Sequence, residues 1–121
     1  MTLFAIYGTF GRRQPGHGNL AGARFVEQVR TAAAYRLYLV DGRWPALVAA
    51  ADGVPIECEL YECSEALLAR LAELEPPGWA RAPLALEDGR EVEAFLGERT
   101  LAARGVDVSE HGGWAAFVRG R

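Results

Sequence analysis

Three acidic–glycine turns, each lying between short apolar segments, constrain the fold of this chain more than any other feature. They are Asp41-Gly42, Asp52-Gly53 and Glu87-Asp88-Gly89. Such turns are typical of β-hairpins, because aspartate and glycine tolerate the positive φ that tight hairpin turns require. The flanking segments are rich in β-branched and aromatic residues, which favours strands. We therefore predict strands at residues 24–31, 35–40, 44–48, 55–62, 79–86 and 92–96, and Pro45 indicates an edge strand or a bend.

The segment 55–62 shows the clearest strand periodicity. The residues expected on its buried face are Ile56, Cys58 and Leu60, and those expected on its polar face are Glu57, Glu59 and Tyr61. The second cysteine, Cys63, lies an odd number of positions after Cys58, so the two side chains point to opposite faces of a regular strand. We therefore expect no disulfide between them.

One segment has the pattern of an amphipathic helix. Ser64 is a predicted N-cap, leucines follow it at helical spacing through Leu74, and Pro76-Pro77-Gly78 ends the element. Glu75 lies at the C-terminal edge of this helix, beside the negative end of the helix dipole. A carboxylate there is expected to have a raised pKa, which suits an acid/base role. The alternative is an ordinary solvated glutamate.

The N-terminal strand and the loop after it hold the candidate binding residues. An apolar strand at 3–6 ends abruptly before Gly8, and the segment Gly8-Thr9-Phe10 exposes backbone N–H groups that can hold an anion or a carbonyl oxygen. Alternatively, Tyr7 and Phe10 are core aromatics and Gly8 only begins a turn. The glycine-rich loop 11–22 ends in a predicted helical turn and is either a binding loop or a solvated surface loop. Its polar candidates are Arg12, Arg13, His17 and Asn19.

Composition bounds the class of protein. With 121 residues the chain is long enough for its own core, so we expect a single domain over residues 1–121. Its net charge of −3 and its dispersed basic residues give no footprint for nucleic acid or an anionic membrane surface. No apolar run approaches the roughly 20 residues that span a bilayer, and no basic region precedes an apolar one at the N-terminus. We therefore expect a soluble, cytoplasmic protein.

The remaining observations complete the predicted fold. Only two histidines are present, and no cluster of His, Cys and Asp has metal-ligand spacing, so metal catalysis is not predicted. Residues 107–114 read as a loop with a short helix from Asp107 onward. Six or so strands around one main helix and short helical segments predict an α+β domain, built as a small mixed β-barrel or curled sheet.

The chain resembles the gamma-glutamylcyclotransferase-like superfamily over most of its length. Tyr7-Gly8-Thr9-Phe10 is similar to the Tyr-Gly-(Ser/Thr)-(Leu/Asn) signature that ends the first strand of that family, and residues 35–38 and 59–62 occupy the places of two of its tyrosine-bearing strands. Residues 71–75 resemble its Leu-Asp-x-x-Glu-Gly segment, which implies that Glu75 is the catalytic glutamate. The chain departs from the pattern at Pro76-Pro77, where the family has glycine, and at Trp79, near a position where the family often has tyrosine.

This resemblance implies an intramolecular aminolysis. The α-amine of a γ-glutamyl amine or peptide attacks its own side-chain carbonyl, which yields 5-oxoproline and a free amine without any cofactor. The N–H groups of Gly8, Thr9 and Phe10 would stabilise charge on oxygen, and Glu75 would act as general acid/base. Tyr7 and the polar loop residues Arg12, His17 and Asn19 would complete the small-molecule site.

A second resemblance competes for the last third of the chain. The segments 94–98, 105–109 and 112–117 are similar to the end of the allophanate hydrolase C-terminal domain, and residues 25–39 and 83–89 also resemble it. That domain shares the cyclotransferase-like fold but usually lacks the Tyr-Gly-Thr signature and the glutamate at the helix end. It implies binding or decarboxylation of an N-carboxylated urea derivative, with His17 and Arg36 as the candidates for proton donor and carboxylate anchor.

A third hypothesis is a non-catalytic domain that docks an amidase partner, and a homodimer is also compatible with the sequence. Glu75 distinguishes these hypotheses, since it is expected to be essential for cyclotransfer and of little importance for docking.

Overall fold

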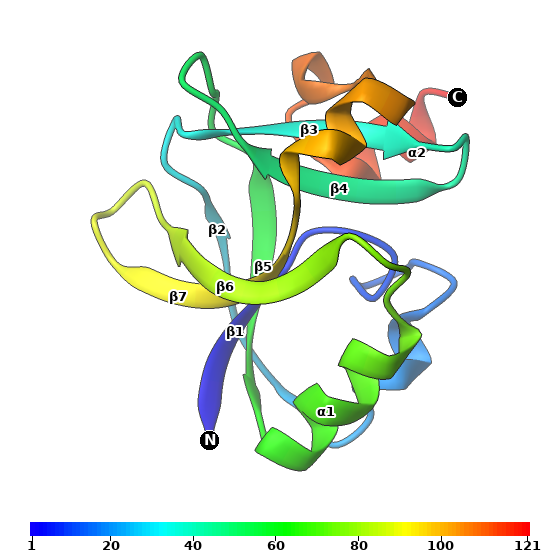
Figure 1. The fold of residues 1–121 in the computed structure, drawn as a ribbon. Helices are drawn as coiled ribbons and strands as arrows, with labels where there is room; N and C mark the ends of the chain where they lie inside the picture. Colours follow the sequence, from blue (N-terminus) through cyan, green and yellow to red (C-terminus); the bar gives the residue numbers. More distant parts are fainter.

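The computed structural model describes residues 1–121 and has eight strands arranged as two curled sheets (Figure 1). The strands are β1 Thr2–Ile6, β2 Arg24–Arg30, β3 Tyr35–Val40, β4 Trp44–Ala49, β5 Glu57–Cys63, β6 Trp79–Ala85, β7 Glu91–Gly97 and β8 Gly105–Asp107. The α-helices are α1 Glu65–Leu74 and α2 Trp114–Arg119, and the 3-10 helices are η1 His17–Leu20, η2 Arg99–Arg104 and η3 Ser109–His111. This confirms the predicted α+β class. No helix combines the length and the apolar character that crossing a membrane would require.

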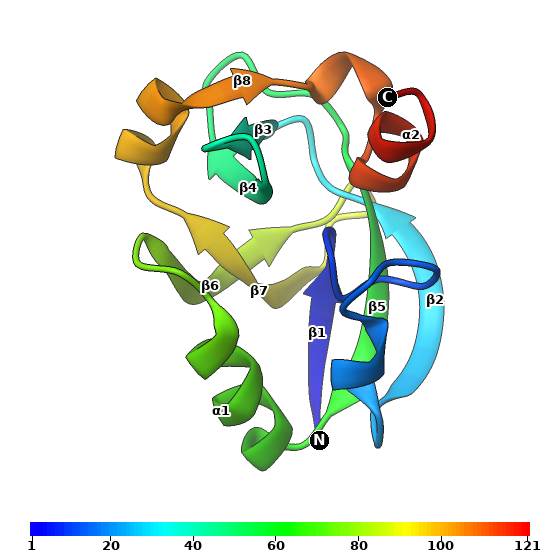
Figure 2. The ribbon, with the colours of Figure 1, turned by 90° about the vertical axis from the view of Figure 1, so that its right-hand side faces the viewer.

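The sheets place the end of β1 between distant parts of the chain. The five-stranded sheet has the order β2-β5-β1-β7-β6, and the three-stranded sheet has the order β4-β3-β8. Strand β1 is antiparallel to β5 and parallel to β7, which makes the larger sheet mixed. Figure 2 shows β1 running upward through the middle of this sheet toward β3 and β4. The loop after β1 therefore meets the smaller sheet.

Two of the three acidic–glycine turns form hairpins as predicted, whereas Asp52-Gly53 lies between β4 and β5, which belong to different sheets. Asp41 and Gly42, with φ of 52° and 74°, connect β3 to β4, and Gly89, with φ of 92°, lies between β6 and β7. Strand β4 is an edge strand, which accommodates Pro45 because an edge position needs no N–H for a neighbouring strand.

The C-terminal part carries more structure than its sequence predicted. Residues 105–107 form β8, which pairs with the end of β3, and residues 114–119 form α2. The short helix expected after Asp107 is present as η3, but β8 and α2 were not predicted. Both elements are short, and their stability comes from tertiary packing: Leu101 before β8 and Trp114 at the start of α2 are buried.

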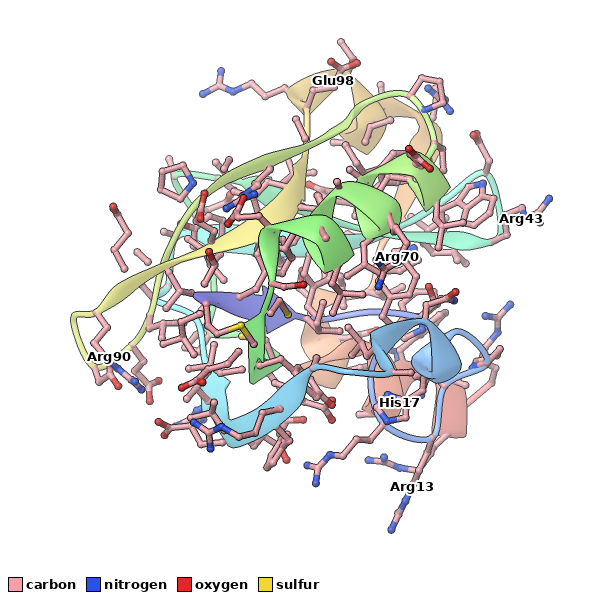
Figure 3. All side chains as sticks on the ribbon, turned by 90° about the horizontal axis from the view of Figure 1, so that it is seen from below. Arg13, His17, Arg43, Arg70, Arg90 and Glu98 are labelled. Carbon is pink, nitrogen blue, oxygen red and sulfur yellow. The ribbon has the colours of Figure 1, made fainter.

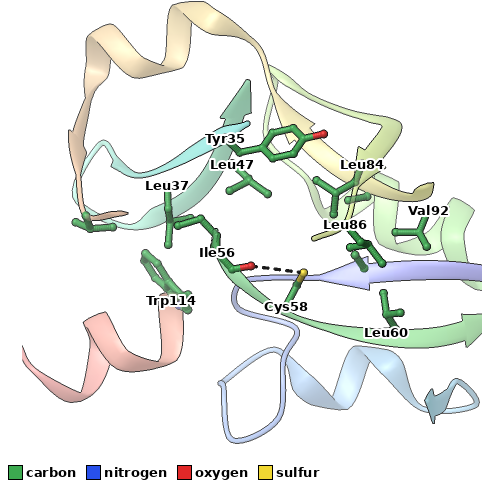
Figure 4. Packing of buried hydrophobic residues seen from close by; sticks show 13 residues of the cluster. Tyr35, Leu37, Leu47, Ile56, Cys58, Leu60, Leu84, Leu86, Val92 and Trp114 are labelled. Carbon is green, nitrogen blue, oxygen red and sulfur yellow. Dashed lines mark hydrogen bonds between the residues drawn. The ribbon is translucent and has the colours of Figure 1, made fainter. Parts of the chain in front are cut away.

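Two hydrophobic clusters lie on opposite faces of the five-stranded sheet. The larger one lies between the sheets and includes Cys58, Leu37 and Leu47 (Figure 4). The smaller one lies under α1 and includes Cys63 and Tyr61. The two cysteines are free and belong to different clusters, as predicted. Tyr61 was expected on a polar face but is only 3% exposed, because α1 and η1 cover that face.

Helix α1 begins as predicted. The Ser64 hydroxyl oxygen accepts a hydrogen bond from the N–H of Leu67 at 3.1 Å, which caps the helix. The side chains of Leu67, Leu68 and Leu71 are buried, whereas Leu74 is 52% exposed. The predicted apolar face therefore stops one turn early, and the exposed Leu74 lies at the edge of the cavity described next.

Candidate functional site

A cavity of about 370 Å³ lies where three segments meet, and we call it the Glu75 cavity. Its walls come from β1 with the loop after it, from the start of β4, and from the residues between α1 and β6. Glu75 is the only charged residue that lines it. Most of the remaining wall is apolar and includes Phe10, Trp44 and Trp79.

Glu75 follows directly after α1 in an extended conformation, with φ of −78° and ψ of 135°. Burial raises the pKa of its carboxyl from 4.5 to about 7. The side chain has no hydrogen-bond or ion-pair partner. The sequence therefore predicted the direction of the pKa shift correctly, but its main cause is burial and not the helix dipole. A carboxyl with this pKa is well suited to exchange protons near neutral pH.

The backbone segment that was predicted to hold an anion or a carbonyl oxygen forms part of the cavity wall. Gly8, Thr9 and Phe10 all line the cavity, and their backbone N–H groups have no acceptor within the chain. Two turn bonds hold the loop, from Gly11 N–H to Gly8 O at 3.0 Å and from Gly16 N–H to Thr9 O at 2.9 Å. Three free donors in an ordered loop can stabilise a carbonyl oxygen or a carboxylate.

Gly8 has a packing role in addition to the predicted one. A Cβ atom at this position would lie 2.5 Å from Cγ of Pro45, which is far inside van der Waals contact. Pro45 packs against the bare backbone of Gly8, so a side chain here would push β4 away from β1.

The Tyr7 hydroxyl group connects the cavity walls. It donates a hydrogen bond to Phe95 O at 2.7 Å and accepts one from Leu47 N–H at 3.1 Å. Burial raises the pKa of the phenol far above its ordinary value, and the nearby Glu75 carboxylate adds to the shift. Tyr7 is therefore a neutral hydrogen-bonding bridge at neutral pH.

The loop candidates divide into two groups. Asn19 lines the Glu75 cavity, and its amide nitrogen donates to Gly16 O at 3.0 Å. His17 does not line it. Its Nδ1 lies 2.9 Å from Phe10 O, so the ring supports the loop instead. Arg13, whose φ is 66°, points away from the molecule (Figure 3).

Two further arginines lie outside the Glu75 cavity. Arg12 is paired with Glu59 at 3.1 Å, and its guanidinium carbon lies 4.1 Å from the centre of the Phe25 ring. Arg36, on β3, is paired with Asp107 and donates to Asp52 O at 2.8 Å. These contacts hold both guanidinium groups at the protein surface, away from the Glu75 cavity.

The sequence did not identify part of the apolar wall. Trp44, Pro45 and Phe95 line the cavity, but they belong to strands whose sequence pattern indicates structure and no binding role. Trp79 Nε1 donates to Pro45 O at 3.0 Å, which joins the start of β6 to β4. One sequence signal for this wall was available, because Trp44 and Trp79 each lie close after a predicted turn. The structure contains no group of three or more His, Cys, Asp or Glu side chains that could hold a metal ion.

Comparison with known proteins identifies both groups that the sequence resembles. A family model described as the allophanate hydrolase C-terminal domain matches residues 2–119. The structure of c4763, a protein specific to uropathogenic E. coli, has a TM-score of 0.90 and 32% identity, and the match covers 98% of this chain and 95% of that one. A comparison with curated proteins gives no match.

Two other solved structures share the fold. The urea amidolyase of K. lactis has a TM-score of 0.91 at 22% identity, and the match covers 98% of this chain but 8% of that one. There the related domain is a small part of a larger protein. An AIG2-like protein of Mus musculus, also designated GGACT, has a TM-score of 0.67 at 25% identity, with 84% of this chain and 78% of that one covered.

Proposed function

This chain belongs to the allophanate hydrolase C-terminal domain family, and from that premise and the Glu75 cavity we propose that it cyclises the γ-glutamyl group of a small amine or peptide to 5-oxoproline. The observation that carries the proposal is the Glu75 carboxyl, with a pKa of about 7, in one cavity with the free N–H groups of Gly8, Thr9 and Phe10. The fold that the chain shares with the mouse GGACT protein supports the same chemistry.

The reaction requires one base and one set of oxyanion donors. Ionised Glu75 takes a proton from the α-ammonium group, and the free amine attacks the γ-carbonyl carbon. A C–N bond forms, and the carbonyl oxygen becomes an oxyanion beside the N–H groups of residues 8–10. Glu75 then returns the proton to the leaving nitrogen, the original C–N bond breaks, and the carbonyl reforms. The ring nitrogen then loses its second proton to the carboxylate, and Glu75 passes this proton to the released amine, which leaves as an ammonium ion, so the carboxylate is regenerated.

Substrate folding is the other task of the site. The nucleophile and the carbonyl belong to one molecule, so catalysis depends on holding the glutamyl group bent into a ring-like geometry. The ordered loop provides fixed donors, and the mostly apolar wall supports the bent glutamyl group. No cofactor takes part in these steps.

The test is mass spectrometric detection of 5-oxoproline from a panel of γ-glutamyl amines and dipeptides. We expect product from the parent protein and a loss of at least about a hundredfold in Glu75→Gln, a typical size for a general acid/base. Glu73→Gln is the matched control, since Glu73 is an exposed glutamate on α1 outside the cavity. Absence of product across the whole panel would contradict the proposal.

The family match favours a second candidate, the removal of CO₂ from an N-carboxylated urea derivative. In that reaction protonated Glu75 would give its proton to the carboxylated nitrogen, and the N–C bond would break with its electrons on nitrogen. His17 and Arg36, the candidates that the sequence offers for this reaction, do not line the Glu75 cavity.

The pH dependence separates the two candidates. Cyclotransfer requires ionised Glu75, so kcat/KM rises with pH through about 7, whereas decarboxylation requires the protonated form and falls over the same interval. Retained CO₂ release in His17→Ala would assign the proton to Glu75, and its loss with Glu75 intact would assign it to His17.

A further inference from the structure

We propose that a second cavity, between α1 and β6, is a subsite for the aliphatic chain of the departing amine, an inference that rests on the proposed cyclotransfer. We call it the α1–β6 cavity. It has a volume of about 190 Å³ and lies on the outer face of the larger sheet. None of the cyclotransfer steps described above requires it.

The two cavities adjoin at the reacting group. Glu75, Trp79 and Phe95 line both of them. In cyclotransfer the leaving nitrogen must lie within hydrogen-bond reach of Glu75, so its substituent starts at the residue where the two spaces meet. The glutamyl group occupies the side that carries the N–H groups of residues 8–10, and the α1–β6 cavity is the free space on the other side of Glu75.

The walls of this cavity suit a hydrocarbon chain. On α1, Ala69 and Ala72 are small, and Leu68 and Phe95 form a buried floor. Trp79 completes the wall on the β6 side. Methylene groups that move from water onto such a surface gain binding free energy in proportion to the area covered.

The charged groups of this cavity leave no free cation for an acidic chain. Arg81 donates to Glu65 at 2.7 and 2.9 Å and to Glu93 at 2.8 and 3.1 Å, so two carboxylates occupy its guanidinium group. The other ionisable groups that line it are Glu65, which is paired with Arg81, and Glu75, and no cation lines the larger cavity. The predicted substrates are γ-glutamyl conjugates of uncharged straight-chain alkylamines, and a terminal carboxylate on the chain is disfavoured.

The first experiment measures binding and turnover for γ-glutamyl-n-alkylamides from methyl to hexyl. Calorimetry gives Kd, and 5-oxoproline formation gives kcat/KM. For the parent protein we expect both to improve with chain length, by up to about fourfold per methylene, which corresponds to about 0.8 kcal/mol. The conjugate of 6-aminohexanoate, which ends in a carboxylate, should bind at least about tenfold more weakly than the hexylamide.

The second experiment fills the cavity. In Ala72→Leu the added side chain takes the space of the substrate chain, so the ratio of hexyl to methyl affinity should fall to near one. Ala66→Leu is the matched control, because Ala66 is an exposed alanine of α1 that lines neither cavity, and it should keep the parental ratio.

Each outcome decides the proposal. A flat chain-length series in the parent, or no binding of any conjugate, overturns it. Equal slopes in Ala72→Leu and Ala66→Leu also overturn it, since the chain would then lie elsewhere. Affinity that rises with chain length and is lost in Ala72→Leu, without any 5-oxoproline, supports the subsite and rejects the proposed function. Product formation without a chain-length effect supports the proposed function and rejects the subsite.

Discussion

At the scale of single residues, the chemistry of Glu75 depends on its surroundings more than on its place in the helix. Its carboxyl is partly buried, lacks a hydrogen-bond partner, and has a pKa raised to about 7 by that burial. A carboxylate kept away from water without a partner opposes folding. A residue of this kind is typical of functional sites, where reactivity is maintained at the expense of stability.

This leads to a prediction about stability and pH. Because the pKa of Glu75 in the folded protein lies above its ordinary 4.5, the folded state binds more protons than the unfolded state between about pH 4.5 and 7. Its contribution to stability is therefore fully present below about pH 4.5 and falls as pH rises to about 7. Glu75→Gln removes this loss and should stabilise the protein at about pH 8 by about 1–2 kcal/mol, after a discount for solvent screening.

Urea unfolding at about pH 5 and about pH 8 measures this difference. The gap between Glu75→Gln and the parent should widen toward the higher pH, whereas Glu73→Gln should follow the parent at both. Equal pH dependence in all three proteins would show that the Glu75 carboxyl is as well solvated in the folded as in the unfolded state.

At the scale of the elements, α1 determines where Glu75 lies. Its N-terminus is capped by Ser64, its buried leucines pack under β1, β5 and β7, and its last residue immediately precedes Glu75. The helix has ten residues, too few to be stable alone in water, so the cap and the packing together maintain it. The position of the carboxyl is therefore sensitive to changes at the far end of the helix.

We predict that Ser64→Ala lowers the free energy of unfolding by about 1 kcal/mol, because the Leu67 N–H loses its acceptor. Ser64→Asp should retain most of the stability, since aspartate is also a good N-cap. Chemical denaturation of the three proteins provides the measurement. If the alanine and aspartate variants were equally destabilised, the loss would come from packing at this position and not from the cap.

At the scale of the whole molecule, the Glu75 cavity exists because two sheets are held together beside it. Tyr7 directly follows β1, and its hydroxyl group forms hydrogen bonds with β7 and β4, which belong to different sheets. The Trp79 indole makes a second link, to Pro45 on β4. These bonds define the separation of the cavity walls.

Tyr7→Phe should therefore weaken the whole fold. The change keeps the ring but leaves Leu47 N–H and Phe95 O without this partner in a buried region, at a cost of about 1–3 kcal/mol. Tyr38→Phe is the control, since no hydrogen bond of the Tyr38 hydroxyl is present. Thermal unfolding should show a lower Tm for Tyr7→Phe alone, and equal Tm values for both variants would contradict the bridging role.

The candidate site was predictable only in part. Glu75 and the segment from Tyr7 to Phe10 were named from the sequence, and the structure brings them to one cavity. Arg36 was a candidate until Asp107, 71 positions away, proved to occupy its guanidinium group. No local pattern reveals such a partner, because an ion pair between distant segments depends on how the sheets pack.

The sequence by itself determined the hairpins, the capped helix, the opposite orientation of the two cysteines and the fold class. Each of these depends on interactions within a few residues: turn dihedral angles, a cap, or a periodicity of two or 3.6. Only the tertiary structure decided that Pro45 packs on Gly8, that Phe95 lines the same cavity as Glu75, and that β8 and α2 form. These features join segments that are distant in the sequence, so they follow from the burial of apolar surface by the whole chain and not from any local preference.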